Sequence, residues 1–154
     1  QLNACVPWLA DQAHIINLSL GLRRRDPTLE SLCQQAHNRN CVLVASTPAI
    51  GEPVYPAAFA TVFSVTGDIK CKPGEFTAKT SKSSIGVYPT LGACCFQSKL
   101  DQEKGKGGAS YAAAHFSAWL AQAMSLGLNK KQWRSLLLQT NKAHPINLMG
   151  ALDP

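Results

Sequence analysis

The sequence predicts an α/β fold, and its pattern of apolar runs supports this prediction. Two continuous runs of aliphatic and β-branched residues, 14–20 and 41–46, are typical of strands buried on both faces. A helical pattern lies between them, and the order strand, helix, strand implies a parallel crossover connection. The chain has 154 residues, of which 45% are hydrophobic, so we expect one core and a single domain over residues 1–154.

The helix between the two strands has the clearest boundaries. Asp26 is a typical N-cap, Pro27 suits the first helical position, and residues 38–40 end the pattern. Its apolar face carries Leu29, Leu32, Cys33 and Ala36. Residues 2–13 also show helical spacing, and Pro7 predicts that this first helix either starts near that residue or is kinked there.

The second half of the chain reads as strands and helices separated by polar loops. Prolines and glycine fill residues 48–56, and residues 60–65 supply a third strand. We expect residues 67–84 to form a polar excursion and residues 99–106 a flexible loop. Short strands are expected at 85–87 and 92–96. A helix follows from Ser110, and a capping box over 129–132 starts a last amphipathic helix with Trp133, Leu136 and Leu137.

The charge pattern argues against nucleic-acid and membrane partners. The net charge is +6, but the cations are scattered over several loops without interleaved aromatic residues, which is typical of solvated surface. No run approaches the ~20 apolar residues that span a bilayer. We therefore expect no nucleic acid and no membrane as partners.

The six cysteines give no fixed pairing, because six allow fifteen connectivities. Cys5, Cys33 and Cys41 sit among apolar neighbours and are expected to be small buried hydrophobes. Cys94 and Cys95 are adjacent and lack a Cys-x-x-Cys partner, so we expect no metal and no other cofactor. Reduced thiols in a cytoplasmic protein are the default expectation.

Residues 107–115, Gly-Gly-Ala-Ser-Tyr-Ala-Ala-Ala-His, are the chain's most informative stretch. Small residues lead to Ser110, and an alanine-rich helix follows that can be packed on all sides. Free backbone N–H groups and the helix dipole stabilise negative charge beside such a hydroxyl, so Ser110 is a candidate nucleophile. A simple N-capping serine is the alternative reading.

This stretch resembles the nucleophile motif Gly-Thr-Ser-Met-Ala-x-Pro-His of the subtilisin-like serine proteases, the subtilases. Two further segments resemble the same family in the same order. Residues 15–21, Ile-Ile-Asn-Leu-Ser-Leu-Gly, are similar to its Ile-Asn-Met-Ser-Leu-Gly strand. Residues 42–47, with Tyr-Pro-Ala-Ala at 55–58, are similar to its Val-Val-Ala-Ala-Ala-Gly-Asn strand and Tyr-Pro-Ala turn. The resemblance spans residues 1 to about 140 and covers the later part of a subtilase domain.

The resemblance implies a three-layer, subtilisin-like α/β fold with a mainly parallel sheet and Ser110 as the catalytic nucleophile. It also implies that two backbone segments border a groove for an extended peptide substrate, which would pair with them as an added strand. Ser19, Leu20 and Gly21 would line one side, and Ala45, Ser46 and Thr47 the other. The alternative is that both segments are ordinary strand ends.

Two departures from the family pattern limit this expectation. The family's Asp-Ser/Thr-Gly and His-Gly-Thr motifs, which carry the other two residues of the Ser-His-Asp triad, do not occur in these residues. They are expected on an N-terminal segment or a companion chain. The family's oxyanion-stabilising Asn falls at Ala49, and loss of that donor costs about 10²–10³ in rate, a magnitude taken from subtilisin itself. Unless Asn38, Asn40, Gln97 or a residue outside this chain takes its place, we expect weak or specialised activity.

The leading hypothesis is therefore a serine-type endopeptidase module that cleaves a peptide or protein, with Asp and His supplied from outside this chain. The alternative is a catalytically weak or inactive pseudoprotease that binds peptides or acts as a scaffold. An unrelated α/β binding domain is the third possibility.

Overall fold

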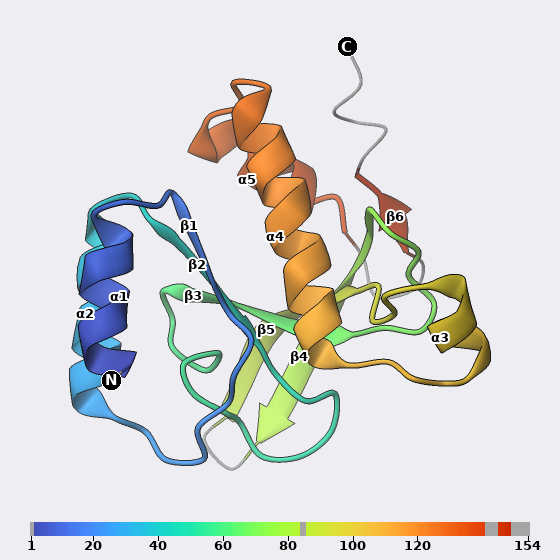
Figure 1. Cartoon of the computed structure of the whole chain (residues 1–154), viewed down its shortest axis with the longest axis horizontal. Coiled ribbons are helices and arrows are strands. Elements are labelled where there is room, and N and C mark those ends of the chain that lie inside the picture. Colours follow the sequence, from blue (N-terminus) through green and yellow to red (C-terminus); the bar gives the residue numbers. More distant parts are fainter. Residues whose placement is uncertain (1, 84–85, 141–144, 149–154) are drawn as a thin grey trace.

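We describe residues 2–83, 86–140 and 145–148 of a computed structural model of the chain (Figure 1). Helices and strands alternate through the first half, as the apolar runs predict. The elements are α1 (Leu2–Ala10), β1 (Ile15–Leu18), α2 (Pro27–Asn38), β2 (Val42–Ser46), β3 (Val62–Gly67), β4 (Glu75–Ser83), β5 (Gly86–Ala93), α3 (Lys99–Glu103), α4 (Ala109–Ser125), α5 (Lys130–Leu137) and β6 (Ile146–Asn147).

The strands form one sheet in the order β1-β2-β3-β5-β4-β6. The first four strands in this order run parallel, with Ile15 opposite Val42, Leu43 opposite Val62, and Val65 opposite Leu91. β4 pairs antiparallel with both β5 and β6. The expectation of a mainly parallel sheet is therefore confirmed, and the carboxyl ends of β1, β2, β3 and β5 share one edge.

Helices cover both faces of this sheet and give three layers (Figure 1). α1 and α2 pack on one face, and α4 and α5 pack on the other. β2 separates the two apolar cores because its side chains alternate. Val42 and Val44 belong to the core under α4, while Leu43 and Ala45 belong to the core under α2.

The helix boundaries follow from local capping chemistry. The Asp26 carboxylate accepts hydrogen bonds from the backbone N–H groups of Thr28 and Leu29, and Pro27 occupies the first turn. Asn129 and Gln132 form the capping box expected at the start of α5. Both helix starts are confirmed.

α4 lies close against the sheet because much of its buried face is alanine. Ala112, Ala113 and Ala123 are fully buried, and they leave room for large rings between them. An aromatic cluster fills that room, formed by Phe63, Phe76, Phe116, Trp119 and Trp133. Ring pairs of this kind stabilise by ~0.5–1.5 kcal/mol each beyond their area burial.

The expected polar excursion over residues 67–84 is wrong for its second half, because residues 75–83 form β4. β4 and β5 make an antiparallel hairpin in which Phe76 lies opposite Ala93 and Ala78 opposite Leu91. Phe76 belongs to the core under α4, whereas Thr77 and Lys79 contact the Asp68 carboxylate. Adjacent side chains of a strand point to opposite faces, and the lysines and threonines of β4 hide this alternation in the sequence.

Three smaller expectations also change. α1 starts at Leu2 and continues through Pro7. Residues 99–103 form the short helix α3, because the Ser98 side chain accepts a hydrogen bond from the Asp101 backbone N–H. Cys5 is exposed, whereas Cys33 and Cys41 are buried as expected; all six cysteines are free thiols.

Candidate active site

Ser110 lies in the first turn of α4, at the edge where the parallel strands end. Gly108 is the N-cap of α4, and its backbone N–H donates to the carbonyl of Cys95, 2.9 Å away, just beyond the end of β5. Figure 1 shows α4 running from this edge back across the sheet. The expected position of Ser110 at the start of a packed helix is confirmed.

Gly107 brings this helix start close to the sheet. A Cβ atom at residue 107 would lie 3.0 Å from Cys95 Sγ and 3.1 Å from the Cys95 carbonyl oxygen. A Cβ at residue 108 would meet only a Tyr111 ring carbon at 3.8 Å. Gly107 is therefore the residue that permits the close approach, and Gly108 has room to spare.

The Ser110 side chain is exposed, and within the described ranges its hydroxyl makes no hydrogen bond. The backbone N–H groups of Ala109 and Ser110 likewise have no hydrogen-bonded partner among those residues, as is usual in the first turn of a helix. These N–H groups and the positive end of the α4 dipole can stabilise an oxyanion that forms beside the hydroxyl.

The tip of β1 lies beside the tip of β2, because Leu18 pairs with Ala45. Ser19 is exposed, and its hydroxyl lies 3.4 Å from the Asn17 side-chain oxygen. Leu20 is half-buried, and Gly21 is exposed. A Cβ at Gly21 would lie 2.9 Å from the side chain of Val54, so Val54 packs directly against the backbone at this tip.

The side chains of the candidate substrate-binding segment at the end of β2, residues 45–47, are almost completely buried. Ala45 is completely buried in the core under α2, Ser46 is 8% exposed and Thr47 is 1% exposed. The Thr47 N–H donates to the Val65 carbonyl, but its buried hydroxyl has no partner within the described ranges. Ala45 is also paired with Leu18 of β1 on one side and with Ser64 of β3 on the other.

Solved structures are the known proteins to which this chain shows similarity. No protein-family model and no curated protein matches the chain. Among solved structures, sphericase superposes with a TM-score of 0.52 at 19% identity, over 87% of this chain and 52% of that protein. The fold is subtilisin-like.

Two further structures are similar at lower scores. The prenylagaramide maturation protease PagA gives a TM-score of 0.45 at 20% identity, over 75% of this chain and 45% of that one. The S41 psychrophilic protease gives 0.43 at 16% identity, over 75% and 46%. The chain spans about half the length of the structures it matches.

Within this subtilisin-like fold, none of the described histidines is placed as a base for Ser110. His115 lies on α4, and its Nε2 is 3.1 Å from the Phe96 carbonyl oxygen. His14 precedes β1 and His37 lies near the end of α2, so both sit at the amino-end edge of the sheet, opposite Ser110. His144 lies outside the described residues.

Asp68 is the buried acid at the carboxyl-end edge, and its carboxylate is fully engaged. It accepts hydrogen bonds from the Lys70 N–H and the Thr77 hydroxyl, and it pairs with Lys79. Burial alone would raise the pKa of the Asp68 carboxyl, but the Lys79, Lys70 and Thr77 hydrogen bonds outweigh it and lower the pKa. Sequence reasoning missed this role of Asp68, because its side-chain partners Thr77 and Lys79 lie on β4, a strand that the sequence did not predict.

Ala49 lies in the exposed loop between β2 and β3, next to Ile50, which is 92% exposed. Its methyl group cannot donate a hydrogen bond, so only its backbone N–H is available there. Within the described ranges, no group of three or more His, Cys, Asp and Glu side chains is placed to hold a metal ion. No helix in that part of the chain is long and apolar enough to cross a bilayer.

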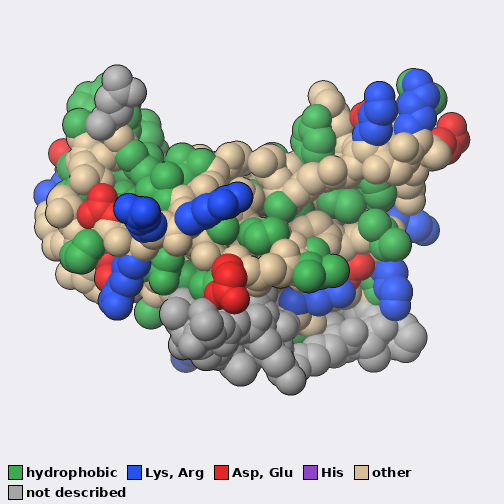
Figure 2. Space-filling model, turned by 90° about the horizontal axis from the view of Figure 1, so that it is seen from below, with side chains coloured by type: hydrophobic (Ala, Val, Ile, Leu, Met, Phe, Trp, Pro, Cys, Tyr) green, Lys and Arg blue, Asp and Glu red, His purple; other side chains and the backbone are tan. Residues whose placement is uncertain are grey.

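Figure 2 shows the molecule from below, the side toward which the parallel strands run. Its outline is hollowed between the end that carries α1 and the end that carries α3. Hydrophobic side chains are visible in the hollow, and Lys and Arg side chains lie toward both ends of this face. The exposed cations Lys99, Lys104 and Lys106 belong to α3 and the loop after it.

Proposed function

We propose that this chain is the nucleophile-bearing part of a serine-type endopeptidase, with Ser110 as the nucleophile. The observation that carries the proposal is an exposed hydroxyl in the first turn of α4, at the carboxyl-end edge of a subtilisin-like sheet. Ser110 Oγ attacks the scissile carbonyl carbon and loses its proton to an imidazole. The imidazolium then gives this proton to the leaving amine as the C–N bond breaks, and water hydrolyses the acyl-enzyme that remains to release the acid and free Ser110.

The substrate in this proposal is an extended peptide that pairs with backbone beyond the end of β1, while the end of β2, which already lies between β1 and β3, walls the groove. Ser19, Leu20 and Gly21 border one side, and Ala45, Ser46 and Thr47 the other. Strand addition of this kind uses main-chain hydrogen bonds, which suits segments whose side chains are small or buried. Val54 lies against Gly21 and narrows that side of the groove, which favours small substrate side chains there.

We propose that the Asp and His of the triad come from a segment or companion chain that docks along β1. β1 is an edge strand with one paired side. α4 beside it exposes small or short residues, Ala114, Ala118, Ala121 and Ser125. Between them lies a hollow of about 370 Å³ that His14, Ile15 and Met124 also border. Exposed strand edges and small-residue helix faces accept added backbone closely.

The alternative function is a pseudoprotease, and the observation that supports it is the alanine at residue 49. Unless another side chain supplies the donor that residue 49 lacks, the oxyanion is held by backbone N–H groups alone, and the rate is lower by about 10²–10³ on the subtilisin scale. Such a protein would process one partner peptide slowly, or bind peptides without cleaving them.

A fluorophosphonate probe tests the proposal on the tagged chain recovered from its own cells with its associated polypeptides. We expect covalent labelling of Ser110, detected by peptide mass spectrometry, and loss of labelling in Ser110→Ala. Ser31→Ala, which removes an exposed hydroxyl of α2 far along the chain from Ser110, should label normally. Ala49→Asn should raise the labelling rate about ten-fold or more. A folded assembly in which Ser110 stays unlabelled supports the pseudoprotease.

A further inference from the structure

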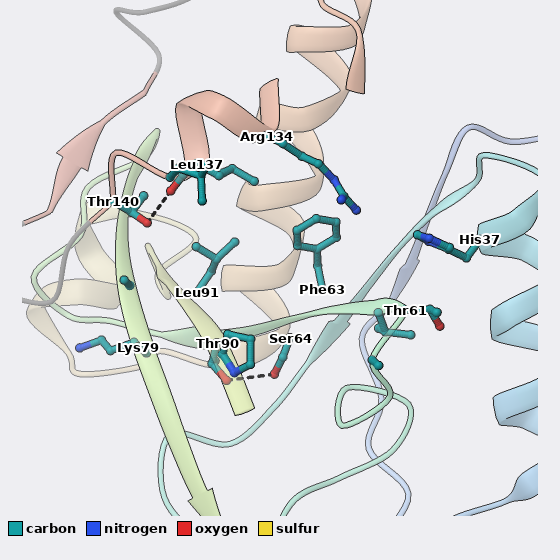
Figure 3. A pocket seen from close by; sticks show the side chains of 15 residues that line it. His37, Thr61, Phe63, Ser64, Lys79, Thr90, Leu91, Arg134, Leu137 and Thr140 are labelled. Carbon is teal, nitrogen blue, oxygen red and sulfur yellow. Dashed lines mark hydrogen bonds between the residues drawn. The ribbon is translucent and has the colours of Figure 1, made fainter. Parts of the chain in front are cut away.

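A second site lies at the opposite edge of the sheet from Ser110. A hollow of about 510 Å³ opens between the start of β3, the β4–β5 hairpin and α5 (Figure 3). β3 and β5 pair only where residues 65–67 meet residues 91–93, so the strands diverge toward the amino end of β3. This divergence leaves the wedge that the hollow occupies.

The walls of the hollow are mostly apolar. Phe63, Leu91 and Leu137 form its inner surface, and Figure 3 shows their side chains turned toward one another around the space. Leu138 lines the rim and is 85% exposed, which is unusual for a leucine beside a cavity. An apolar hollow with an exposed apolar rim favours a ligand with a hydrophobic body.

The hollow also has a cation, Arg134, that no carboxylate among the described residues neutralises. The Arg134 guanidinium lies 5.8 Å from the centre of the Phe63 ring and 5.6 Å from that of Trp133. In Figure 3 it extends from α5 over Phe63 into the space toward His37. No ion pair joins Arg134 to a carboxylate within the described ranges. The Lys79 ammonium differs, because it lies 2.7 Å from an Asp68 carboxylate oxygen.

The positive charges around His37 also indicate that the mouth of the hollow attracts a negative group. The pKa of His37 is lowered by burial and, after that, by the positive charges of Lys130 and Arg134. The two positive charges disfavour a further positive charge at the mouth of the hollow, whereas burial disfavours a charge of either sign. A negative group would be attracted there, and a guanidinium stacked on a ring is already held in place for it.

We propose that this hollow binds a small amphipathic carboxylate, with its apolar body against Phe63, Leu91 and Leu137 and its carboxylate on the Arg134 guanidinium. One uncompensated guanidinium above apolar walls matches a single negative charge on a hydrophobic body better than a polyanion. Planar guanidinium and carboxylate groups pair by two parallel hydrogen bonds. The site is separate from Ser110 and does not depend on catalysis there.

Isothermal titration with octanoate tests the proposal on the purified full chain. We expect one octanoate per chain, with a Kd on the order of 10⁻⁴–10⁻³ M. Octanamide, which has the same body without the charge, should bind about ten-fold more weakly. Arg134→Gln should weaken octanoate about ten-fold, whereas Lys131→Gln, on the same helix but outside the hollow, should not.

A second variant keeps the test decisive if Arg134→Gln does not fold. Thr61→Trp places a large ring into the hollow from its rim and leaves every cation in place, so it should abolish octanoate binding. Absence of octanoate binding to the wild type would overturn the proposal, as would equal affinities for octanoate and octanamide. Preferential binding of a peptide with a carboxyl-terminal leucine would also overturn it, because the occupant would then be a polypeptide.

Discussion

Asp68→Asn is the substitution for which the structure gives the most specific expectation. Asp68 follows β3, is 5% exposed, and its backbone N–H donates to the carbonyl of Ala93 at the end of β5. Oδ1 accepts from the Lys70 N–H at 3.0 Å, and Oδ2 from the Thr77 hydroxyl at 2.8 Å. The Lys79 ammonium lies 2.7 Å from Oδ2. The carboxylate therefore joins β3, β4 and the loop between them.

The size of the effect follows from these bonds. An asparagine at residue 68 keeps one acceptor oxygen and turns an NH₂ group toward the remaining donors. Hydrogen bonds to charged groups contribute about 1.5–3 kcal/mol each, so the loss would be about 2–4 kcal/mol after the retained bond is counted. The Lys79 side chain is 39% exposed and can turn to water, which keeps the loss toward the lower value.

The pH dependence has a definite sign. The pKa of Asp68 is lower in the folded chain than in the unfolded chain, where a free Asp titrates near ~3.9. The carboxylate therefore stabilises the fold fully above the unfolded pKa, and this stabilisation is lost as the pH falls through the folded pKa. The difference between wild type and Asp68→Asn should be largest near neutral pH and should shrink in acid.

Urea denaturation followed by circular dichroism, at neutral and acid pH, measures how much Asp68→Asn lowers the free energy of unfolding and how this loss changes with pH. Asp11→Asn is the matched control, because Asp11 is 64% exposed and pairs with Arg39 on the surface. Asp11→Asn should lower the free energy of unfolding by less than ~1 kcal/mol. A neutral-pH difference no larger for Asp68→Asn than for Asp11→Asn would refute the reasoning, and so would a difference that grows in acid.

Packing and burial also predict the effects of substitutions at Gly107, Gly108 and Trp119 and the rates at which the cysteine thiols react. Gly107→Ala should lower the free energy of unfolding by about 1–3 kcal/mol in urea denaturation, because its Cβ would press on the end of β5. Gly108→Ala, which has space, should cost less than that. Trp119→Phe removes the indole N–H bond to the Leu148 carbonyl (3.2 Å) and part of a buried ring, so we expect a loss of about 1–3 kcal/mol by the same measurement. A thiol reagent should label Cys5 rapidly and the five buried thiols slowly; mass spectrometry showing rapid labelling elsewhere would contradict the burial pattern.

The parts of the fold that depend on local chemistry could be predicted from the sequence. The start of α2 depends only on Asp26, Pro27 and the two residues after them. The β2 run is apolar throughout because helices cover both faces of the sheet at this strand. The glycines before Ser110 indicate a close approach, and Gly107 makes one. In each case the determining residues are neighbours along the chain.

The parts that depend on distant residues could not be predicted. The polar residues of β4 gave no apolar run, and only its pairing with β5 shows that Phe76 faces the core. Val54 meets Gly21 across 33 residues of sequence, which spacing alone does not indicate. The hollow beside Arg134 arises from the angle between β3 and β5, a property of the assembled sheet.

The position of β2 also bears on how the molecule opens. All five of its residues are buried, and strands flank it on both sides, whereas β1 has a neighbour on one side only. Deuterium should therefore enter the amides of Ile16 and Leu18 through local fraying, while Leu43 and Val44 should exchange only when the entire chain unfolds. The N-terminal helix and strand can then detach for a moment while the structure around α4 persists.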